Sequence, residues 1–254
     1  MLSNMSTPNL EVKPHPVLSD YYSDESERRR RVDEMFDSSA IYYDKINSIM
    51  SLGSGKWYRR QALLRAGVKE GQHILDVGAG TGVVSLLSQK IVGETGKVIA
   101  LDPSIGMLDV AKKNGVKHTM QGLGENLPFP DNQFDFVTMG YALRHVADLG
   151  MLFTEYHRVL KPGGKVLLLE ITKPKPGISY HLVKFYLKRI IPTASLLLLG
   201  SAKTQHLMQY YWDTIEQCVP PETILSTMRI SGLTNTNRYV EQGIFSEYTG
   251  SKIT

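Results

Sequence analysis

The feature that most constrains this chain is a glycine-rich turn directly after a short apolar run. Residues 74–82 read Ile-Leu-Asp-Val-Gly-Ala-Gly-Thr-Gly, and residues 83–91 repeat apolar side chains at helical spacing. This order predicts a buried parallel strand, a sharp turn and a helix. Three glycines in five residues let the backbone turn tightly and let a ligand lie directly against main-chain atoms. Dinucleotide enzymes use a similar turn, so the turn alone does not define the ligand.

Two carboxylates narrow the choice of ligand. Asp76 stands just before the glycines, where it can bind a polar group, and the next apolar run, Val98–Asp102, ends on Asp102. In folds of this type a carboxylate at that position accepts hydrogen bonds from a ribose diol. The turn and the two carboxylates together resemble motif I and the acidic loop of class I S-adenosylmethionine-dependent methyltransferases. The resemblance implies S-adenosylmethionine as the cofactor, with a dinucleotide site and a merely structural turn as the alternatives.

Length and charge are compatible with one large core and a small accessory region. The 254 residues are 42% hydrophobic and 21% charged, with a formal net charge of +4. Basic residues concentrate only in the run Glu27–Arg31, which lies beside further acidic residues. We interpret that run as a solvated helix face, and we expect no nucleic-acid partner.

Cysteine usage and the N-terminal sequence indicate a reducing compartment. The single cysteine, Cys218, excludes an intramolecular disulfide, and no cysteine or histidine cluster has metal-ligand spacing. The N-terminal residues lack a basic segment followed by an apolar run, which argues against a secretory signal. We therefore expect a cytoplasmic protein without a metal site.

From His73 onward, short apolar runs alternate with helical patterns, which is typical of a parallel sheet covered by helices. The expected strands are His73–Val77, Val98–Asp102, Lys117–Gln121, Phe134–Met139 and Lys165–Glu170, followed by a closing pair at Thr234–Val240 and Ile244–Thr249. The expected helices are Val83–Val92, Ser104–Asn114, Leu149–Leu160 and one that starts at Pro220–Glu222 and ends at Ile230, with Ser104 and Asp148 as N-caps.

Three segments interrupt or precede this alternation. Residues 1–20 are polar and contain several prolines, which predicts a flexible tail. Residues 21–65 interleave charged and aromatic side chains and predict an N-terminal helical lid, although a helix packed on the sheet edge explains them almost as well. Residues 66–254 form the predicted methyltransferase domain, in which 174–219 is a helical insertion over the active site. The basic, amphipathic stretch 181–191 is too short to span a membrane but suits a peripheral membrane contact.

A second resemblance narrows the family. Residues 43–53 with Trp57 look like the N-terminal signature of ubiquinone/menaquinone biosynthesis C-methyltransferases, and Leu127–Asp135 matches a loop of that family. Residues 141–146, Tyr-Ala-Leu-Arg-His-Val, resemble the family's segment after the fourth strand, and 158–165 and 169–174 also match. The resemblance covers residues 35–174. It implies an α/β Rossmann-like class I fold with a mostly parallel seven-stranded sheet, and methyl transfer to a ring carbon of a quinol-type substrate.

The same resemblance implies a set of site residues. Arg144 would hold the phenolate form of the acceptor or polarise a water, and His145, which titrates near neutrality, would be a base or would shape the loop. The acceptor ring would pack against Tyr43, Trp57, Tyr141 and Tyr211. The cofactor would contact Asp76, Gly78, Ala79, Gly80, Gly82, Asp102, Pro103, Met107, Leu123, Gly124 and Glu125.

The sequence departs from the family pattern at two of these positions. Leu123 stands where an acidic residue usually accepts a hydrogen bond from the adenine amino group, so adenine would use a backbone carbonyl, a water or Glu125. His145 stands where asparagine is usual. These changes leave open an oxygen or nitrogen methyltransferase acting on a secondary metabolite. A methyltransferase-fold subunit that binds without transferring methyl is a further alternative, and a homodimer is allowed.

Overall fold

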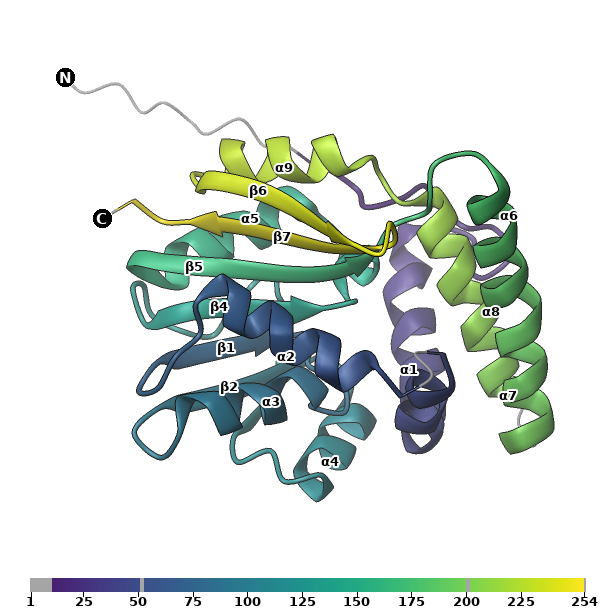
Figure 1. The fold of residues 1–254 in the computed structure, drawn as a ribbon, viewed down its shortest axis with the longest axis horizontal. Coiled ribbons are helices and arrows are strands. Elements are labelled where there is room, and N and C mark those ends of the chain that lie inside the picture. The colour runs from purple at the N-terminus through teal and green to yellow at the C-terminus, as the bar shows by residue number, and fades with distance from the viewer. Residues whose placement is uncertain (1–10, 51–52, 200–201, 254) are drawn as a thin grey trace.

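The computed structural model describes residues 11–50, 53–199 and 202–253, which fold around one seven-stranded sheet (Figure 1). The strand order is β3-β2-β1-β4-β5-β7-β6, and each pair of neighbours is parallel except the two that involve β7. The strands are β1 (His73–Val77), β2 (Lys97–Asp102), β3 (Thr119–Gln121), β4 (Phe134–Gly140), β5 (Leu160–Ile171), β6 (Thr234–Glu241) and β7 (Phe245–Ser251). The predicted α/β fold with a mostly parallel seven-stranded sheet is confirmed.

Helices cover both faces of the sheet because consecutive strand residues point in opposite directions. Ile74 packs in one apolar cluster with Leu63, and the next residue, Leu75, packs in another with Phe153. In Figure 1, one face carries α2 (Gly55–Ala66), α3 (Val83–Val92) and α4 (Ile105–Lys113), and the other carries α5 (Leu149–Val159) and α9 (Pro221–Ile230). The predicted N-caps are present: the Ser104 hydroxyl accepts from the amide of Met107 at 3.0 Å, and Asp148 Oδ1 accepts from two amides of α5.

A further group of helices stands at the carboxyl ends of the parallel strands (Figure 1). It consists of α1 (Glu25–Met50), α6 (Ile178–Phe185), a π-helical turn (Tyr186–Ile190), α7 (Ile191–Leu199) and α8 (Ala202–Gln217). Side chains of α1 tie it to the sheet domain: Asp37 accepts from the amide of Gly106 at 3.1 Å, and Asp44 accepts from Asn114 Nδ2 at 3.0 Å. Of the predicted lid, 21–65, α1 therefore lies at the strand ends, whereas α2 packs on a sheet face.

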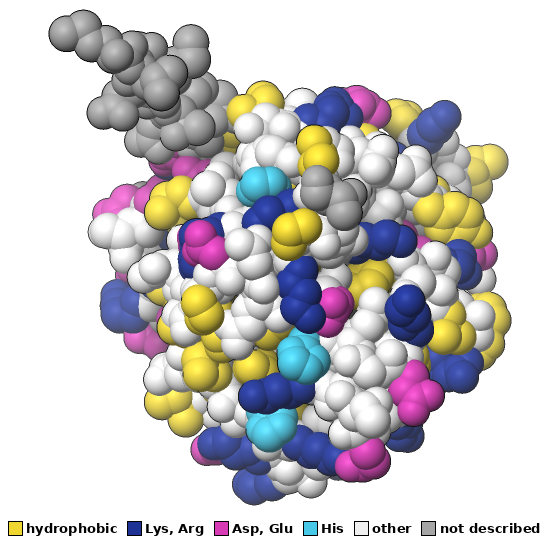
Figure 2. Space-filling model, turned by 90° about the vertical axis from the view of Figure 1, so that its left-hand side faces the viewer, with side chains coloured by type: hydrophobic (Ala, Val, Ile, Leu, Met, Phe, Trp, Pro, Cys, Tyr) yellow, Lys and Arg dark blue, Asp and Glu magenta, His cyan; other side chains and the backbone are white. Residues whose placement is uncertain are grey.

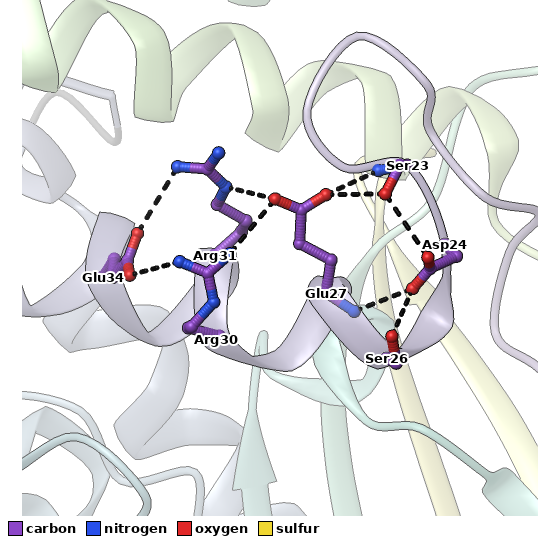
Figure 3. Close-up of polar contacts among 7 residues, drawn as sticks. All are labelled: Ser23, Asp24, Ser26, Glu27, Arg30, Arg31 and Glu34. Carbon is purple, nitrogen blue, oxygen red and sulfur yellow. Dashed lines mark hydrogen bonds and ion pairs between the residues drawn. The ribbon is translucent and has the colours of Figure 1, made fainter.

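The start of α1 is fixed by a reciprocal cap (Figure 3). Asp24 Oδ1 accepts from the amide of Glu27 at 2.9 Å, and Glu27 Oε2 accepts from the amide of Ser23 at 2.9 Å. Arg30 and Arg31 are exposed and pair with the acidic side chains drawn beside them. Those two arginines form the solvated face expected from the sequence.

The second half of the predicted tail, residues 11–20, contacts the domain. The carbonyl of Val12 accepts from the amide of Leu149 at 2.9 Å, and the carbonyl of Pro14 accepts from the amide of Val219 at 2.8 Å. The His15 side chain is buried. These contacts supply acceptors for two backbone amides of the domain. The first half of the predicted tail, 1–10, lies outside the described residues.

On the face shown in Figure 2, charged side chains of both signs are interspersed, in keeping with the small net charge of +4. Figure 2 looks onto the end of the molecule opposite the α1/α6–α8 group, and basic side chains there alternate with acidic, histidine and neutral ones. Among the helices described, none is both long and apolar enough to cross a membrane.

Candidate active site

One pocket, with about 1000 Å³ of empty space that is partly open to solvent, lies at the carboxyl ends of β1, β2 and β4. Its sheet side is formed by the glycine turn after β1, the end of β2 and the segment after β4. Its outer side is formed by α1, through Val32, Phe36 and Tyr43. Carboxyl ends of parallel strands are where open α/β sheets bind ligands, and this pocket brings most of the predicted site residues together.

The three glycines of the turn are required for different reasons. All have positive φ angles, of 62°, 55° and 84° for Gly78, Gly80 and Gly82. A Cβ on Gly82 would lie 2.4 Å from Val116, and one on Gly78 would lie 2.5 Å from the Ala142 side chain. A Cβ on Gly80 would meet nothing within 4 Å, and Gly80 lines the pocket. Gly80 therefore leaves main-chain atoms open to a ligand, whereas Gly82 allows close packing behind the turn.

Asp102 presents a buried carboxylate at the edge of the pocket. Its Oδ2 accepts from the amide of Gly80 at 2.8 Å, and its Oδ1 accepts from the amide of Ser104 at 2.9 Å. Burial raises the pKa of Asp102 to about 6, although both amides favour the charged form. A carboxylate held this way costs stability in the empty pocket, and a ligand with hydroxyl donors would lower that cost.

Asp76 occupies a different place from the one predicted. It is fully buried beneath the turn, where it accepts from Ser85 Oγ at 2.5 Å and from Thr138 Oγ1 at 2.8 Å, and it does not line the pocket. Burial raises the pKa of Asp76 to about 6. Its carboxylate joins β1, α3 and β4, and so it supports the turn rather than facing the ligand.

The remaining predicted cofactor residues separate into two groups. Leu123, Gly124 and Glu125 form one wall of the pocket, and Glu125 Oε1 accepts from the amide of Ala147 at 2.6 Å. Pro103 and Met107 also line the pocket, whereas Ala79 and Gly82 lie outside its lining. The main chain at Gly80 is open to a ligand, and the buried Asp102 carboxylate beside it can accept hydrogen bonds from the ribose hydroxyls of a nucleoside. These residues therefore fit S-adenosylmethionine.

Two of the four predicted acceptor residues reach this pocket. Tyr43 and Tyr141 line it. Trp57 is 62% exposed, and both Trp57 and Tyr211 line a neighbouring cavity instead. The Tyr211 ring lies under the Arg144 guanidinium, 4.4 Å from it.

Arg144, which the sequence predicts to be catalytic, is turned away from the pocket. The side chain is 0% exposed; Nε donates to Glu170 Oε2 at 2.9 Å and Nη1 donates to Thr214 Oγ1 at 2.7 Å. Burial acts to lower the pKa of Arg144, but the charge of Glu170, its hydrogen bond to Arg144 and the neighbouring Tyr211 together outweigh burial, and the pKa is raised. The guanidinium is thus committed to a buried ion pair that joins the segment after β4 to β5 and α8.

Of the two predicted catalytic residues, Arg144 and His145, it is His145 that faces the pocket. It ends a 3₁₀ turn, Leu143–His145, and its ring lies 5.0 Å from that of Phe36. Nδ1 is 3.3 Å from Tyr210 Oη, and the buried Nε2 has no hydrogen-bond partner among the described residues. Burial, followed by the charge of Arg144, lowers the pKa of His145 well below its usual value, so the ring is neutral near pH 7.

The sequence analysis predicted Tyr43 of α1 but missed three other residues of this helix, Arg28, Asp33 and Phe36. Arg28 is 3% exposed and donates to the carbonyl of Arg144 at 3.0 Å, so it does not belong to the solvated face. Asp33 and Phe36 also line the pocket, and burial raises the pKa of Asp33. The signal was present in the spacing: Arg28, Val32 and Phe36 recur every four residues and share one side of the helix.

Within the part of the chain that the structure describes, no group of histidine, cysteine, aspartate or glutamate side chains could hold a metal ion. The glycine turn, the carboxylate at the end of β2 and the pocket between them define a class I S-adenosylmethionine-dependent methyltransferase. Solved structures share the fold: a SAM-dependent methyltransferase from Aquifex aeolicus has a TM-score of 0.59 at 22% identity, covering 83% of this chain and 98% of that one. Phosphoethanolamine N-methyltransferase 2 from Haemonchus contortus has a TM-score of 0.62 at 19% identity, covering 89% of this chain and 60% of that one.

Sequence comparison identifies the family. Residues 23–252 match the ubiE/COQ5 methyltransferase family, and the chain belongs to it. It is 33% identical over 236 residues to a ubiquinone/menaquinone biosynthesis C-methyltransferase, UbiE, of Pseudoalteromonas translucida, covering 90% of this chain and 93% of the relative. It is also 33% identical over 236 residues to a demethylmenaquinone methyltransferase of Symbiobacterium thermophilum, covering 89% of this chain and 94% of the relative. The family and the cofactor class predicted from the sequence are confirmed.

Proposed function

We propose that this chain transfers the methyl group of S-adenosylmethionine to a ring carbon of a quinol-type acceptor. The names of the relatives support a quinone precursor as the acceptor class. The pocket supports it independently, because three aromatic side chains, Phe36, Tyr43 and Tyr141, are part of its lining. A flat aromatic ring suits that lining better than a small aliphatic amine would.

In this proposal the protein binds the cofactor, orients the acceptor ring and excludes water from the pocket. Asp102 accepts from the ribose hydroxyls, Gly78 and Gly80 let the backbone approach the ligand, and the adenine lies beside Leu123 with Glu125 nearby. When bound, S-adenosylmethionine supplies an already activated methyl group on a sulfonium. Placement of an electron-rich ring carbon is therefore the main task of the protein, and α1 covers the pocket to keep water out.

The proposed task of His145 is to hold the acceptor hydroxyl. A hydrogen bond from that hydroxyl to the neutral imidazole shifts electron density toward the acceptor oxygen and makes the ring carbon more nucleophilic. Nε2 is buried and has no partner among the described residues, so an acceptor oxygen that reached it after a rotation of the imidazole ring would satisfy a polar atom that is otherwise costly to bury. Because the ring is neutral, His145 acts as a hydrogen-bonding partner rather than as a charged group. Asparagine offers the same kind of bond, and it is the usual residue of the family.

The observation that carries the proposal is that one pocket contains both the cofactor-binding residues Gly80 and Asp102, called the cradle below, and a group of aromatic side chains next to His145. The test is methyl incorporation from labelled S-adenosylmethionine into a reduced naphthoquinol, compared with a simple phenol and an aliphatic amine. The quinol is expected to accept the label and the amine to remain unlabelled. His145→Asn is expected to keep most turnover. Labelling of the amine alone, with loss of turnover in His145→Asn, would overturn the proposal in favour of nitrogen methylation with His145 as base.

We also propose that the protein acts in the cytoplasm and touches a membrane through α6. Residues 171–212 contain six Lys or Arg residues (173, 175, 184, 188, 189 and 203) and no Asp or Glu. Two of the six, Lys184 and Lys188, pair with Glu216 and Asp213 of α8. Ile178, Leu182 and Phe185, spaced three or four residues apart, are exposed on α6. An apolar stripe in a basic segment suits an anionic lipid surface better than a second copy of this chain, which carries the same charges. Co-sedimentation with vesicles containing an anionic lipid, but not with neutral vesicles, is expected; a dimer in solution without vesicle binding would support the homodimer instead.

A further inference from the structure

Arg28 of α1 places a buried positive charge in the wall of the active-site pocket. Its side chain is 3% exposed, and it lines the pocket together with His145. Nη2 donates to the carbonyl of Arg144, the residue directly before His145, at 3.0 Å. Arg28 therefore packs against the 3₁₀ turn that carries His145.

His15, in the segment before α1, holds the Arg28 guanidinium in place. Its Nδ1 lies 2.7 Å from the carbonyl oxygen of Pro16, which can only accept a hydrogen bond, so Nδ1 carries the ring proton. Nε2 then has the lone pair, and it accepts from Arg28 Nη2 at 3.0 Å. Because burial, followed by the charge of Arg28, lowers the pKa of His15 to about 4, the ring keeps this neutral form near pH 7. Nη2 thus donates both to His15 and to the turn.

The positive charge of Arg28 is compensated less completely than that of Arg144. Arg144 Nε donates to the buried carboxylate of Glu170 at 2.9 Å. The carboxylate beside Arg28 is Glu25, whose Oε2 accepts from Nη1 at 3.2 Å, and Glu25 is 28% exposed, so water screens this pair in part. Nε of Arg28 is buried and has no hydrogen-bond partner among the described residues. The pocket wall beside His145 therefore retains positive charge that a bound anion would compensate.

The neighbouring charges that act on the His145 ring are basic. Burial first, and then the charges of Arg144, His15 and Arg28, lower the pKa of His145. A field that opposes a positive charge on the imidazole favours a negative charge on a ligand atom held beside it. The other charged residues lining the pocket are Glu25, Arg29, Asp33, Asp102 and Glu125, and the phenols of Tyr210 and Tyr211 contact the His145 ring from α8. Asp102 and Glu125 accept hydrogen bonds from backbone amides, which offset part of their charge.

We propose that Arg28 is a positioning residue for the acceptor: it fixes the turn that carries His145, and its charge favours the ionised form of an acceptor hydroxyl held there. The inference rests on the proposed function and adds a residue of α1 to it. The proton of the hydroxyl leaves to water as the acceptor binds, since the pocket is partly open to solvent. The neutral imidazole can donate to the resulting oxyanion in one tautomer, as it can accept from the hydroxyl in the other. A fixed charge in a buried wall stabilises the anion without reorganisation, and the anion makes the ring carbon more nucleophilic.

The ionisation of a bound phenol tests this inference without methyl transfer. The probe is a nitronaphthol with the nitro group para to the hydroxyl, whose phenol and phenolate forms absorb at different wavelengths. It is titrated with pH while bound to protein saturated with S-adenosylhomocysteine, which has no methyl group to transfer. We expect the pKa of the bound probe to lie below that of the free probe, and Arg28→Met to raise it by about one pH unit, a tenfold change in ionisation.

Two variants and one affinity serve as controls. Arg28→Lys keeps the charge and should retain most of the lowered pKa of the bound probe. Arg30→Met removes an arginine from the exposed side of the same helix and should leave that pKa unchanged. The affinity for S-adenosylhomocysteine, measured by calorimetry, should be the same in all three variants and controls for folding. In turnover, Arg28→Met should move the acidic limb of the pH–rate profile to higher pH.

A merely structural role of Arg28 gives a different result. Arg28→Met would then weaken binding of the phenol and the phenolate equally, and the pKa of the bound probe would not move; this result would overturn the proposal. In the unaltered protein alone, a bound probe whose pKa equals or exceeds that of the free probe, or the lack of saturable binding, would overturn it as well. Failure of the proposed function is distinguishable, because the probe would then ionise as expected while no quinol is methylated.

Discussion

Replacing Arg144, which forms a buried ion pair with Glu170, tests whether Arg144 has a structural or a catalytic role. In Arg144→Ala the Glu170 carboxylate stays buried with its charge uncompensated, and Thr214 and the carbonyl of Tyr211 lose a donor. Removing one partner of a buried ion pair costs about 3–5 kcal/mol. We expect the free energy of unfolding, measured by urea denaturation, to fall by about that amount, with turnover falling because the segment 141–145 loses its anchor.

Two controls give this prediction its force. Arg30 also makes two ion pairs, but at the exposed surface of α1, and Arg30→Ala should cost no more than about 1 kcal/mol. In the double variant Arg144→Ala/Glu170→Ala no unpaired charge remains, so its loss of stability should be clearly smaller than the sum of the two single losses. The reasoning is refuted if Arg144→Ala unfolds at the same urea concentration as the unaltered protein and still loses about a hundredfold in turnover, since that pattern indicates a group acting on the reacting atoms.

Three further predictions concern the cradle and the N-terminal segment. Asp102→Ala should weaken S-adenosylmethionine binding about tenfold or more in calorimetry, through loss of charge-assisted hydrogen bonds, whereas Asp109→Ala on the exposed side of α4 should not; equal affinities in both would remove Asp102 from the site. Gly80→Ala and Gly82→Ala both place a side chain at a positive φ and should both cost stability, but Gly82→Ala should cost more, because its Cβ would also lie 2.4 Å from a neighbouring side chain, whereas Gly80→Ala should in addition weaken cofactor binding; the reverse order in thermal unfolding would contradict this assignment. Burial, followed by the charge of Arg28, lowers the pKa of His15 to about 4, below its value of 6.5 in the unfolded chain, so the unfolded state binds more protons between these values. The contribution of His15 is therefore complete above pH 6.5 and is lost as the pH falls toward 4; His15→Gln should narrow the stability difference between pH 7.5 and pH 4.5 by an amount on the order of 3 kcal/mol, and an unchanged difference would show that His15 titrates normally.

The core of the site was predictable because its signals are local. β1 has the predicted bounds, His73–Val77, since a short apolar run before a glycine turn specifies a buried parallel strand. Ser104 caps α4 as predicted because capping depends on the neighbouring three residues. Asp102 lies at the edge of the pocket because a strand end fixes where its last residue lies.

The misplaced residues depend on contacts far along the chain. Arg144 and His145 are adjacent in a 3₁₀ turn, and which one faces the pocket is decided by Glu170, 26 residues away, and Thr214, 70 residues away. The burial of Arg28 likewise depends on how α1 lies across the strand ends. Residues 11–20 make backbone hydrogen bonds to α5 and to the segment before α9, and composition gives no signal for such contacts.

The most direct test of the proposed carbon methylation is the position of the transferred methyl group. The protein is incubated with S-adenosylmethionine labelled with carbon-13 in the methyl group and with a reduced demethylmenaquinone, and the product is examined by carbon NMR. The labelled signal is expected in the region of methyl groups bonded to aromatic carbon, and it should fall to about one tenth or less when Asp102→Ala replaces the unaltered protein at limiting cofactor. A labelled signal in the region of methyl groups bonded to oxygen would contradict methyl transfer to the ring carbon.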